Sequence, residues 1–477
     1  MGHGDIWVVP GAPLPRGAGW RIWYSRPGAD DFVPETPLVR HAGRPTAVTT
    51  RWAPLDPYPG LGRRMGVLDV VIEERSPGST YDVVIPETPL RQYRWRTLPR
   101  TLDGGVSFVL ASCFYLPADK DGGYAAGLRD LTKIEQPVFK LLIGDQVYQD
   151  WPPNLKPLDD PVARFARRYD EYWRHPAYRE VLTSSPNLFT CDDHEFWNGY
   201  PERAYQVPST WTEQWRRDNG RVARDLFRYY QTASNPNQRG WFDFEVGPVS
   251  FFVTDTRSER TKLDVDDPHL FGDSQWAALE DWARRLAGPG VLVLGQPLFG
   301  KKGDWKEPAL RDFDGDFGRL CSVIEAALGR GHDVLVLSGD IHRARHFRAT
   351  LVGLSAGPGV HELVSSSASR LQVGPALHDP HVHDDALKFT VEHRGASRTW
   401  EAAPIPPTPG GLPSADNNLA VIRMSTGTAT ADTSNRVRFS LEVWSLRPFT
   451  KVWRKLGPWR QPKGSLVRLY EKELELR

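Results

Sequence analysis

Short apolar runs in this chain end repeatedly in residues of the types that bind metal ions. The run at 141–143 leads into Gly144 and Asp145, and Tyr148 follows three residues after the aspartate. Three other runs end in the same way, at Cys113, at Asp192, Asp193 and His194, and at Asp340 and His342. Carboxylate, imidazole, thiolate and phenolate groups gathered in one buried crevice are unfavourable without cations, so the pattern predicts a metal centre.

The elements that must position these residues are the apolar runs themselves. Runs as uniformly apolar as these are typical of strands buried on both faces in a layered α/β fold. Loops at the carboxyl ends of such strands converge on one crevice, which is where the candidate residues stand. Asp145 is the natural bridge between two ions, because two-metal hydrolytic sites hold their metals ~3.5–4 Å apart, within reach of one carboxylate.

Tyr148 and Cys113 bear on the identity of the metal. Phenolate is a hard anionic ligand of high pKa, so its presence favours a strongly acidic ion such as Fe(III), which a thiolate also tolerates. Zinc accepts a cysteine but needs no tyrosine. Each residue alone also has an ordinary interpretation, since a buried cysteine is often a small hydrophobe and a Gly-Asp pair is often a turn. Their joint occurrence at strand ends favours the metal interpretation.

Composition indicates a globular chain with no dominant charge. The 477 residues include 40% hydrophobic and 25% charged residues, and 60 Lys+Arg nearly balance 59 Asp+Glu. We therefore expect neither nucleic acid nor an anionic membrane as a partner. No run approaches the ~20 apolar residues of a membrane-spanning helix, and the start lacks the pattern of a signal peptide. A cytoplasmic location without membrane insertion is expected, unless a leader has been removed.

A change in sequence pattern near residue 100 divides the chain into two predicted domains. Residues 1–100 contain short β-type runs separated by Pro and Gly, which predicts a small β-sandwich. Residues 104–477 alternate apolar strands with helical stretches and form the predicted catalytic domain. It includes helical insertions at about 161–184 and 209–234, a Pro/Gly loop at about 403–418, and late strands that we add to the catalytic sheet.

Seven motifs carry a resemblance to a known family. GDQVY, CDDHEFWNGYP, VTDTRSER, DSQWAALEDWARRL, GQPLF, LSGDIHRAR and ELVSSSAS occur in this order. Together they resemble the PhoD-like alkaline phosphatase and phosphodiesterase family of the metallophosphoesterase superfamily, over roughly 100–430. The resemblance implies a four-layer α/β/β/α sandwich with Fe(III) beside Ca(II), with Mn, Zn or Mg as alternative occupants. It implies iron ligands Cys113, Tyr148 and His342, a bridging Asp145, second-metal ligands Asp193 and Asp340, and a phosphate-contacting, proton-donating His194.

The chain departs from the wider superfamily pattern at two positions. Cys113 stands where the first motif, DxH, would supply a ligand, as it does in the PhoD-like branch. Gln296 stands near the expected histidine of the fourth motif, and its role as ligand, substrate contact or neither stays open. Asn198, four residues after His194, either touches substrate or fixes its loop.

Two further groups of residues have competing interpretations. Arg257 and Arg260 have the geometry to clamp phosphate oxygens bidentately, or they pair with Asp255 or Glu259. Arg257 is the one we assign to catalysis. The segment HDPHVHDD, which includes three histidines at 378–383, is predicted to be a solvated or lid segment rather than another metal site.

These residues predict a metal-dependent phosphoric ester hydrolase. A metal-bound hydroxide would attack phosphorus in line, Arg257 would stabilise the equatorial oxygens, and His194 would assist the leaving oxygen. The substrate is expected to be a small phosphate mono- or diester, without preference between them, and the oligomeric state stays open. The alternative is a non-catalytic phosphate- or metal-binding protein on the same scaffold, for which a broken set of ligands would be expected. A DNA nuclease would call for a basic surface.

Overall fold

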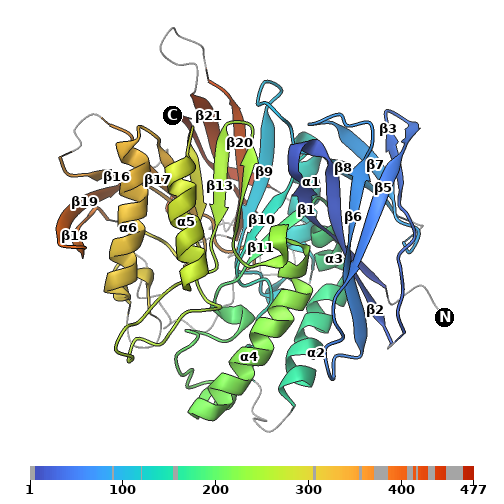
Figure 1. Ribbon diagram of the computed structural model, residues 1–477, viewed down its shortest axis with the longest axis horizontal. Coiled ribbons are helices and arrows are strands. Elements are labelled where there is room, and N and C mark those ends of the chain that lie inside the picture. Colours follow the sequence, from blue (N-terminus) through green and yellow to red (C-terminus); the bar gives the residue numbers. More distant parts are fainter. Residues whose placement is uncertain are drawn as a thin grey trace, which may run out of the picture.

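Two large β-sheets packed face to face form the centre of the molecule (Figure 1). The six-stranded sheet has the order β11-β10-β9-β20-β21-β22, and the eight-stranded sheet has the order β12-β13-β14-β15-β17-β16-β19-β18. Phe108 and Leu141 of the first sheet share a buried cluster with Phe251 and Leu335 of the second. The strands of the first are β9 (Val106–Ala111), β10 (Lys140–Ile143), β11 (Asn187–Thr190), β20 (Asn418–Thr426), β21 (Val437–Ser445) and β22 (Val467–Leu476). Those of the second are β12 (Phe242–Val246), β13 (Val249–Val253), β14 (Gly290–Val293), β15 (Val334–Ser338), β16 (Arg345–Leu351), β17 (Val360–Val364), β18 (Leu387–His393) and β19 (Ala396–Pro404).

The computed structural model describes residues 6–477 apart from positions 29, 89–90, 120, 154–159, 304–307, 354–356, 370–384, 406–411, 415–416, 428–435 and 447–465. Residues 378–384 of the predicted histidine-rich segment at 378–385 lie outside the described residues, as do positions 406–411 and 415–416 of the predicted Pro/Gly loop. Among the helices of the described ranges, none is both long enough and apolar enough to pass through a bilayer.

Each sheet contains a block of parallel strands whose carboxyl ends supply loops. Strands β9, β10 and β11 are parallel, and so are β13, β14, β15 and β17. Every residue of β10, β14 and β15 is buried, in agreement with their mainly apolar sequences. The late strands β20, β21 and β22 pair antiparallel beside β9, within the six-stranded sheet.

Helices cover both outer faces of this sheet pair. On one face Leu142 of β10 clusters with Leu128 and Phe227, and on the other Leu292 of β14 clusters with Leu279. The layers therefore follow the predicted order α/β/β/α, and α2, α3 and α4 fall within the two predicted helical stretches. The helices are α1 (Gly123–Ile134), α2 (Pro161–Arg174), α3 (Pro176–Thr183) and α4 (Glu213–Tyr230) on the six-stranded sheet, and α5 (Asp273–Arg285) and α6 (Asp314–Gly329) on the eight-stranded sheet.

The N-terminal residues form two antiparallel four-stranded sheets with a common core. The sheets have the orders β1-β2-β6-β5 and β4-β3-β7-β8. Trp20 of the first lies 5.6 Å from Tyr81 and 5.7 Å from Trp95 of the second, ring centroid to ring centroid, so the two sheets make the predicted β-sandwich. The strands are β1 (Trp7–Leu14), β2 (Gly19–Pro27), β3 (Leu38–His41), β4 (Arg44–Thr46), β5 (Val48–Pro54), β6 (Arg63–Ile72), β7 (Thr80–Val84) and β8 (Gln92–Arg96).

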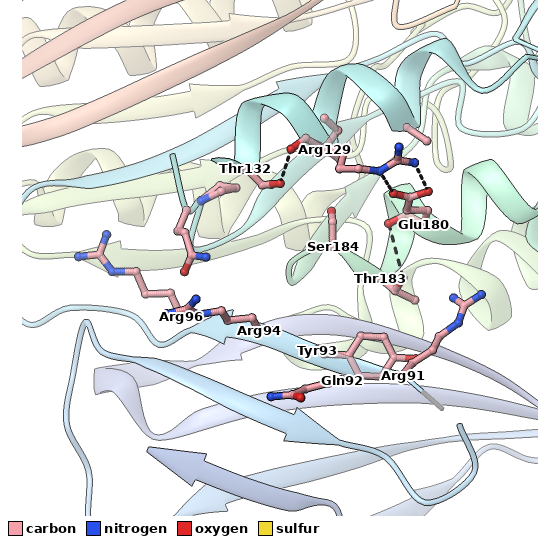
Figure 2. A pocket seen from close by; sticks show the side chains of 14 residues that line it. Arg91, Gln92, Tyr93, Arg94, Arg96, Arg129, Thr132, Glu180, Thr183 and Ser184 are labelled. Carbon is pink, nitrogen blue, oxygen red and sulfur yellow. Dashed lines mark hydrogen bonds and ion pairs between the residues drawn. The ribbon is translucent and has the colours of Figure 1, made fainter. Parts of the chain in front are cut away.

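The sandwich packs against the helical side of the six-stranded sheet. The indole N–H of Trp23 donates to the carbonyl of Tyr229 at 2.8 Å, and the side-chain amide of Asn187 donates to the carbonyl of Pro10 at 2.6 Å. On the same side a cleft separates β8 from α1 and α3 (Figure 2).

Candidate metal centre

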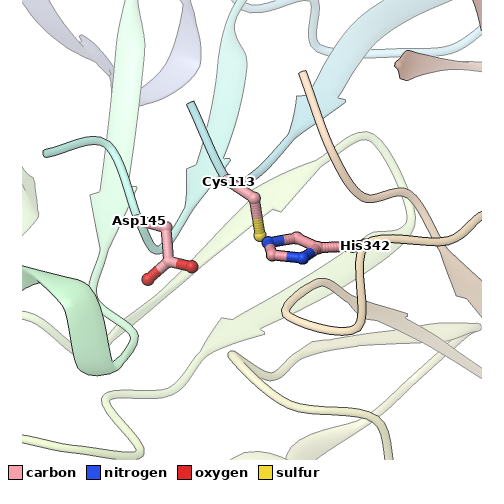
Figure 3. Close-up of side chains that lie close together, drawn as sticks. All are labelled: Cys113, Asp145 and His342. Carbon is pink, nitrogen blue, oxygen red and sulfur yellow. The ribbon is translucent and has the colours of Figure 1, made fainter. Parts of the chain in front are cut away.

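Three loops at the carboxyl ends of central strands bring together a thiol, a carboxylate and an imidazole. Cys113 follows β9, Asp145 follows β10 and His342 follows β15. Figure 3 shows the three side chains close to one another, and one ligand atom from each lies within 4.8 Å of the other two. The two packed sheets therefore place residues up to 229 positions apart around one point.

Tyr148 completes this group. Its hydroxyl lies 3.4 Å from Nε2 of His342 and 3.5 Å from Oδ2 of Asp145, and its side chain is fully buried. The four residues thus offer a sulfur, a phenol oxygen, an imidazole nitrogen and a carboxylate oxygen to one space, the donor set that the sequence predicts for one metal.

A second group of ligand atoms adjoins the first and consists mainly of carboxylates. Asp145 and Asp193 form one close set with His194, and Asp192 and Asp193 form another with Asp340. Asp145 thus belongs both to the set with the thiol and to a set with Asp193. This arrangement offers two neighbouring metal positions with Asp145 between them, the geometry in which one carboxylate can bridge two ions.

The backbone is strained at four of the six predicted ligands. The φ angles are 55° at Cys113, 55° at Asp145, 71° at Asp340 and 51° at His342. Residues other than glycine rarely adopt this left-handed region, and each instance costs on the order of 1–3 kcal/mol. Such strain persists where the surroundings fix it and gathers at functional sites. It aims these side chains inward as the chain leaves the strands.

The chemistry of the donor set fits metal ions and fits poorly without them. Burial, and then the nearby charge of Asp145, raises the pKa of the Cys113 thiol and of the Tyr148 phenol well above their usual values. Oδ2 of Asp192 and Oδ1 of Asp193 are buried and have no hydrogen-bond partner among the described residues. Unpaired buried carboxylate oxygens are costly. Cations at this position would satisfy these oxygens and favour the ionised thiol and phenol.

Glu195 links the loops that carry the candidate ligands, and sequence analysis missed it. Its carboxylate accepts hydrogen bonds from the backbone N–H groups of Asp145 at 2.8 Å, Gln146 at 2.7 Å and Asp192 at 3.0 Å. Burial raises the pKa of Glu195 to about 7, although these N–H groups act in the opposite direction. The residue therefore holds two loops of the centre in register without reaching the metal positions itself.

His194 is held by a carboxylate that sequence analysis also missed. Its Nδ1 lies 2.7 Å from Oδ1 of Asp150, and its ring stacks on Tyr148 with centroids 4.0 Å apart. Burial acts to lower the pKa of His194, but Asp150, Asp193 and Asp145 hold that pKa well above the usual value. The imidazole thus lies beside the candidate metal ligands, in surroundings that favour its charged form. The one available signal is that Asp150 falls in the same loop as Asp145, five residues later.

The family of the chain follows from a match over more than half of its sequence. Residues 108–400 match the PhoD-like phosphatase family model. The chain belongs to the PhoD-like phosphatase family. PhoD-like phosphatases are metal-dependent phosphoric ester hydrolases, and the buried acid, thiol and imidazole groups described above are candidate ligands for the metals.

Similarity to the solved structure of PhoD supports the fold of this PhoD-like phosphatase. The structure of PhoD aligns with 97% of this chain and 91% of its own, with a TM-score of 0.53 and 16% sequence identity. GAP50, the anchor in the inner membrane complex of Plasmodium, aligns with 77% of this chain and 89% of its own, with a TM-score of 0.35 and 12% identity. Comparison with curated protein sequences gives no match.

Arg257 lies in this PhoD-like phosphatase beside the carboxylates, and its guanidinium does not pair with Asp255, one of the alternative partners considered from sequence. Its guanidinium Nε donates to Oδ1 of Asp192 at 2.5 Å and its Nη1 donates to the carbonyl of Tyr200 at 3.2 Å. The alternative partner Asp255 accepts instead from the backbone N–H of Arg257 at 3.1 Å. One donor of the buried guanidinium, Nη2, has no partner among the described residues. Whether Arg257 holds phosphate stays a prediction.

Gln296 and Arg260 form a second layer behind Asp340. The side-chain amide of Gln296 donates to Oδ2 of Asp340 at 3.2 Å, and its oxygen accepts from Arg260 at 2.9 Å. Burial, and then the like charge of Arg257, lowers the pKa of Arg260 to about 9. Gln296 therefore orients a candidate ligand. Asn198 is half-buried, and its backbone N–H donates to Oδ2 of Asp150 at 2.9 Å. Asp150 therefore holds both this backbone group and the ring of His194.

Proposed function

We propose that the chain hydrolyses phosphoric esters at the centre formed by Cys113, Asp145, Tyr148 and His342 on one side and Asp193 and Asp340 on the other. The observation that carries the proposal is that Asp145 belongs to both groups of candidate ligands. A shared carboxylate is the element that a dinuclear centre requires.

The donor types suggest different metals for the two positions. Thiolate, phenolate and imidazole favour Fe(III) at the first, while carboxylate oxygens favour Ca(II) at the second. Mn, Zn and Mg are the alternative occupants. When bound, such a pair lowers the pKa of a water molecule and offsets negative charge on the phosphoryl group.

The chain's own residues are proposed to bind and protonate the substrate. Asp150 engages Nδ1 of His194 and leaves Nε2 to give a proton to the leaving oxygen. The buried guanidinium of Arg257 adds positive charge close to the carboxylates, and its unpartnered Nη2 is the donor that we assign to a phosphoryl oxygen. The proposed substrate is a small phosphate mono- or diester.

The test compares Asp145→Asn with a matched control, Asp119→Asn. Asp119 is also a buried carboxylate, but it accepts the backbone N–H of Tyr124 at the start of α1, away from the centre. Hydrolysis of p-nitrophenyl phosphate and bis(p-nitrophenyl) phosphate is expected to disappear in Asp145→Asn and to persist in the control, with both variants folded by circular dichroism. Undiminished turnover by folded Asp145→Asn would refute the proposal. A wild-type chain that binds metal but turns over neither ester would instead be a binding protein on this scaffold.

A further inference from the structure

The cleft between β8 and helices α1 and α3 is a second place where this chain gathers charge. Its volume is about 460 Å³, and none of the candidate metal ligands lines it. Figure 2 shows the side chains of Gln92 and Arg94 on one wall and those of Arg129 and Ser184 on the other. The cleft thus lies where the N-terminal sandwich meets the helices of the catalytic domain.

The strand side of the cleft is cationic and largely uncompensated. Arg91, Arg94 and Arg96 all line it. Arg96 donates from Nε and Nη2 to two backbone carbonyls, at 2.8 and 3.1 Å, which are neutral acceptors. The guanidinium groups of Arg91 and Arg94 make no hydrogen bond or ion pair with any residue that the structure describes. Three guanidinium charges therefore face the cleft from one short segment.

The helical side offsets only part of this charge, since Glu135 at the end of α1 acts on Arg96 but is itself paired with Arg423. Glu180 is the acidic residue among those that line the cleft, and it is already engaged by Arg129, whose Nε and Nη2 donate to its two oxygens at 2.5 and 2.6 Å. Burial, and then the like charge of Arg91, lowers the pKa of the neighbouring Arg179. An additional cation in this region is thus disfavoured and an anion is favoured.

A lysine is buried beneath the cleft, and burial lowers the pKa of its amine well below the usual value. Lys140 is fully buried, and its Nζ donates to Oγ of Ser184 at 3.1 Å, to Oγ of Ser185 at 3.0 Å and to the carbonyl of Ser185 at 2.6 Å. Three acceptors match the three donors of an ammonium group, yet all three are neutral. Ser184 itself lines the cleft, so its hydroxyl lies between Lys140 and a molecule bound there.

We propose that this cleft binds a small molecule that carries two or more phosphoryl groups. Arginine recognises phosphate with two parallel N–H donors, and Arg91 and Arg94 have these donors free of partners among the described residues. Arg94 and Arg96 are two residues apart on an extended strand, and therefore about 6.6 Å apart along it. Two phosphoryl groups on one small molecule would engage guanidinium groups spread along this strand, where a single phosphate would engage fewer of them.

The size of the cleft agrees with such a ligand. A volume of 460 Å³ falls within the range of roughly 300–1,000 Å³ typical of small-molecule sites, and it is much larger than one orthophosphate requires. Ala125 and Leu128 add an apolar part to the wall, against which the carbon skeleton of an organic polyphosphate would pack. The site does not depend on the proposed hydrolysis.

The test is calorimetric titration of inorganic tripolyphosphate into Asp145→Asn protein, in which turnover at the metal centre does not contribute heat. Adding Arg91→Ala with Arg94→Ala is expected to weaken binding by roughly tenfold or more, because two charge-assisted pairs with the anion are lost together. Gln92→Glu, which adds a negative charge to the same wall, is expected to weaken binding in the same direction without removing an arginine.

The matched control replaces two exposed arginines elsewhere on the sandwich, Arg44→Ala with Arg51→Ala, which lowers the net charge by the same amount. Binding in this control is expected to change by less than about twofold, as is usual for exposed charges. Equal affinity in the cleft variant and the control would overturn the proposal, as would absence of binding in the parent protein. Orthophosphate binding as tight as that of tripolyphosphate would also overturn it, since one phosphoryl group would then suffice.

Discussion

Replacement of Asp150 by asparagine isolates the proton-donating role of His194. The Asp150 carboxylate accepts from Nδ1 of His194 at 2.7 Å through one oxygen and from the backbone N–H of Asn198 at 2.9 Å through the other. An asparagine side chain offers only one acceptor oxygen, so one of the two contacts becomes a donor facing a donor. The imidazole then loses either its orientation or the charge that raises its pKa.

The size of the effect follows from the bond that is lost. A hydrogen bond to a charged group contributes about 1.5–3 kcal/mol, and a tenfold change in rate corresponds to about 1.4 kcal/mol. If the contact acts fully in the transition state, kcat for Asp150→Asn falls roughly 10- to 150-fold. The loss should be largest for alkyl phosphates, whose leaving oxygen needs a proton, and smaller for nitrophenyl phosphates, whose leaving oxygen does not.

The assay is steady-state hydrolysis of an alkyl ester and a nitrophenyl ester by wild-type protein, Asp150→Asn and Asp316→Asn. Asp316 is a matched control because its carboxylate accepts a backbone N–H, that of Leu270 at 2.7 Å, outside the metal centre. The control should retain its kcat for both esters. An Asp150→Asn variant with wild-type kcat for the alkyl ester, or with equal losses for both esters, would refute the assignment of His194 as the proton donor.

Three further predictions concern the metal, the strand ends and the sheet interface. If iron occupies the first position, Tyr148→Phe should abolish a phenolate charge-transfer band in the visible spectrum, and a band that survives in this variant would exclude Tyr148 as the ligand. Gly144→Ala should unfold at lower temperature, by more than about 1 kcal/mol in stability, because φ is +86° and the added Cβ would lie 2.4 Å from Cβ of Asp192. Unchanged melting would contradict that packing. Burial lowers the pKa of His361, which bonds His346 at 3.2 Å, to about 4. Only the unfolded imidazole then binds a proton between pH 6.5 and 4, so stability in urea should fall by about 2 kcal/mol from pH 7 to pH 5, and by less in His361→Gln.

The candidate ligands could be predicted because each is marked locally. Asp145 and Asp340 directly follow apolar strands, and the topology of parallel strands brings such positions to one edge whatever the strand order. The order of strands within the two sheets is not indicated by any short sequence pattern of this kind. The four layers were expected from the family resemblance rather than from the pattern of apolar residues.

Residues that act through a distant partner could not be predicted in this way. The alternative partners considered for Arg257 were residues next to it in sequence, but its guanidinium bonds Asp192, which is 65 positions away. Asp150 and Glu195 are not predicted metal ligands. Asp150 positions His194, and Glu195 accepts hydrogen bonds from the backbones of two loops. Nothing in the residue types alone distinguishes these carboxylates from surface ones, because the contact that defines them exists only after folding.

Elemental analysis of the purified chain and of Asp145→Asn tests the dinuclear centre most directly. Wild-type protein is expected to hold at least two metal ions per chain, one of them iron, and Asp145→Asn is expected to lose metal from both positions because it removes the shared ligand. A wild-type chain that hydrolyses phosphoric esters with fewer than two bound metals, or an Asp145→Asn variant with the full wild-type complement, would contradict the account.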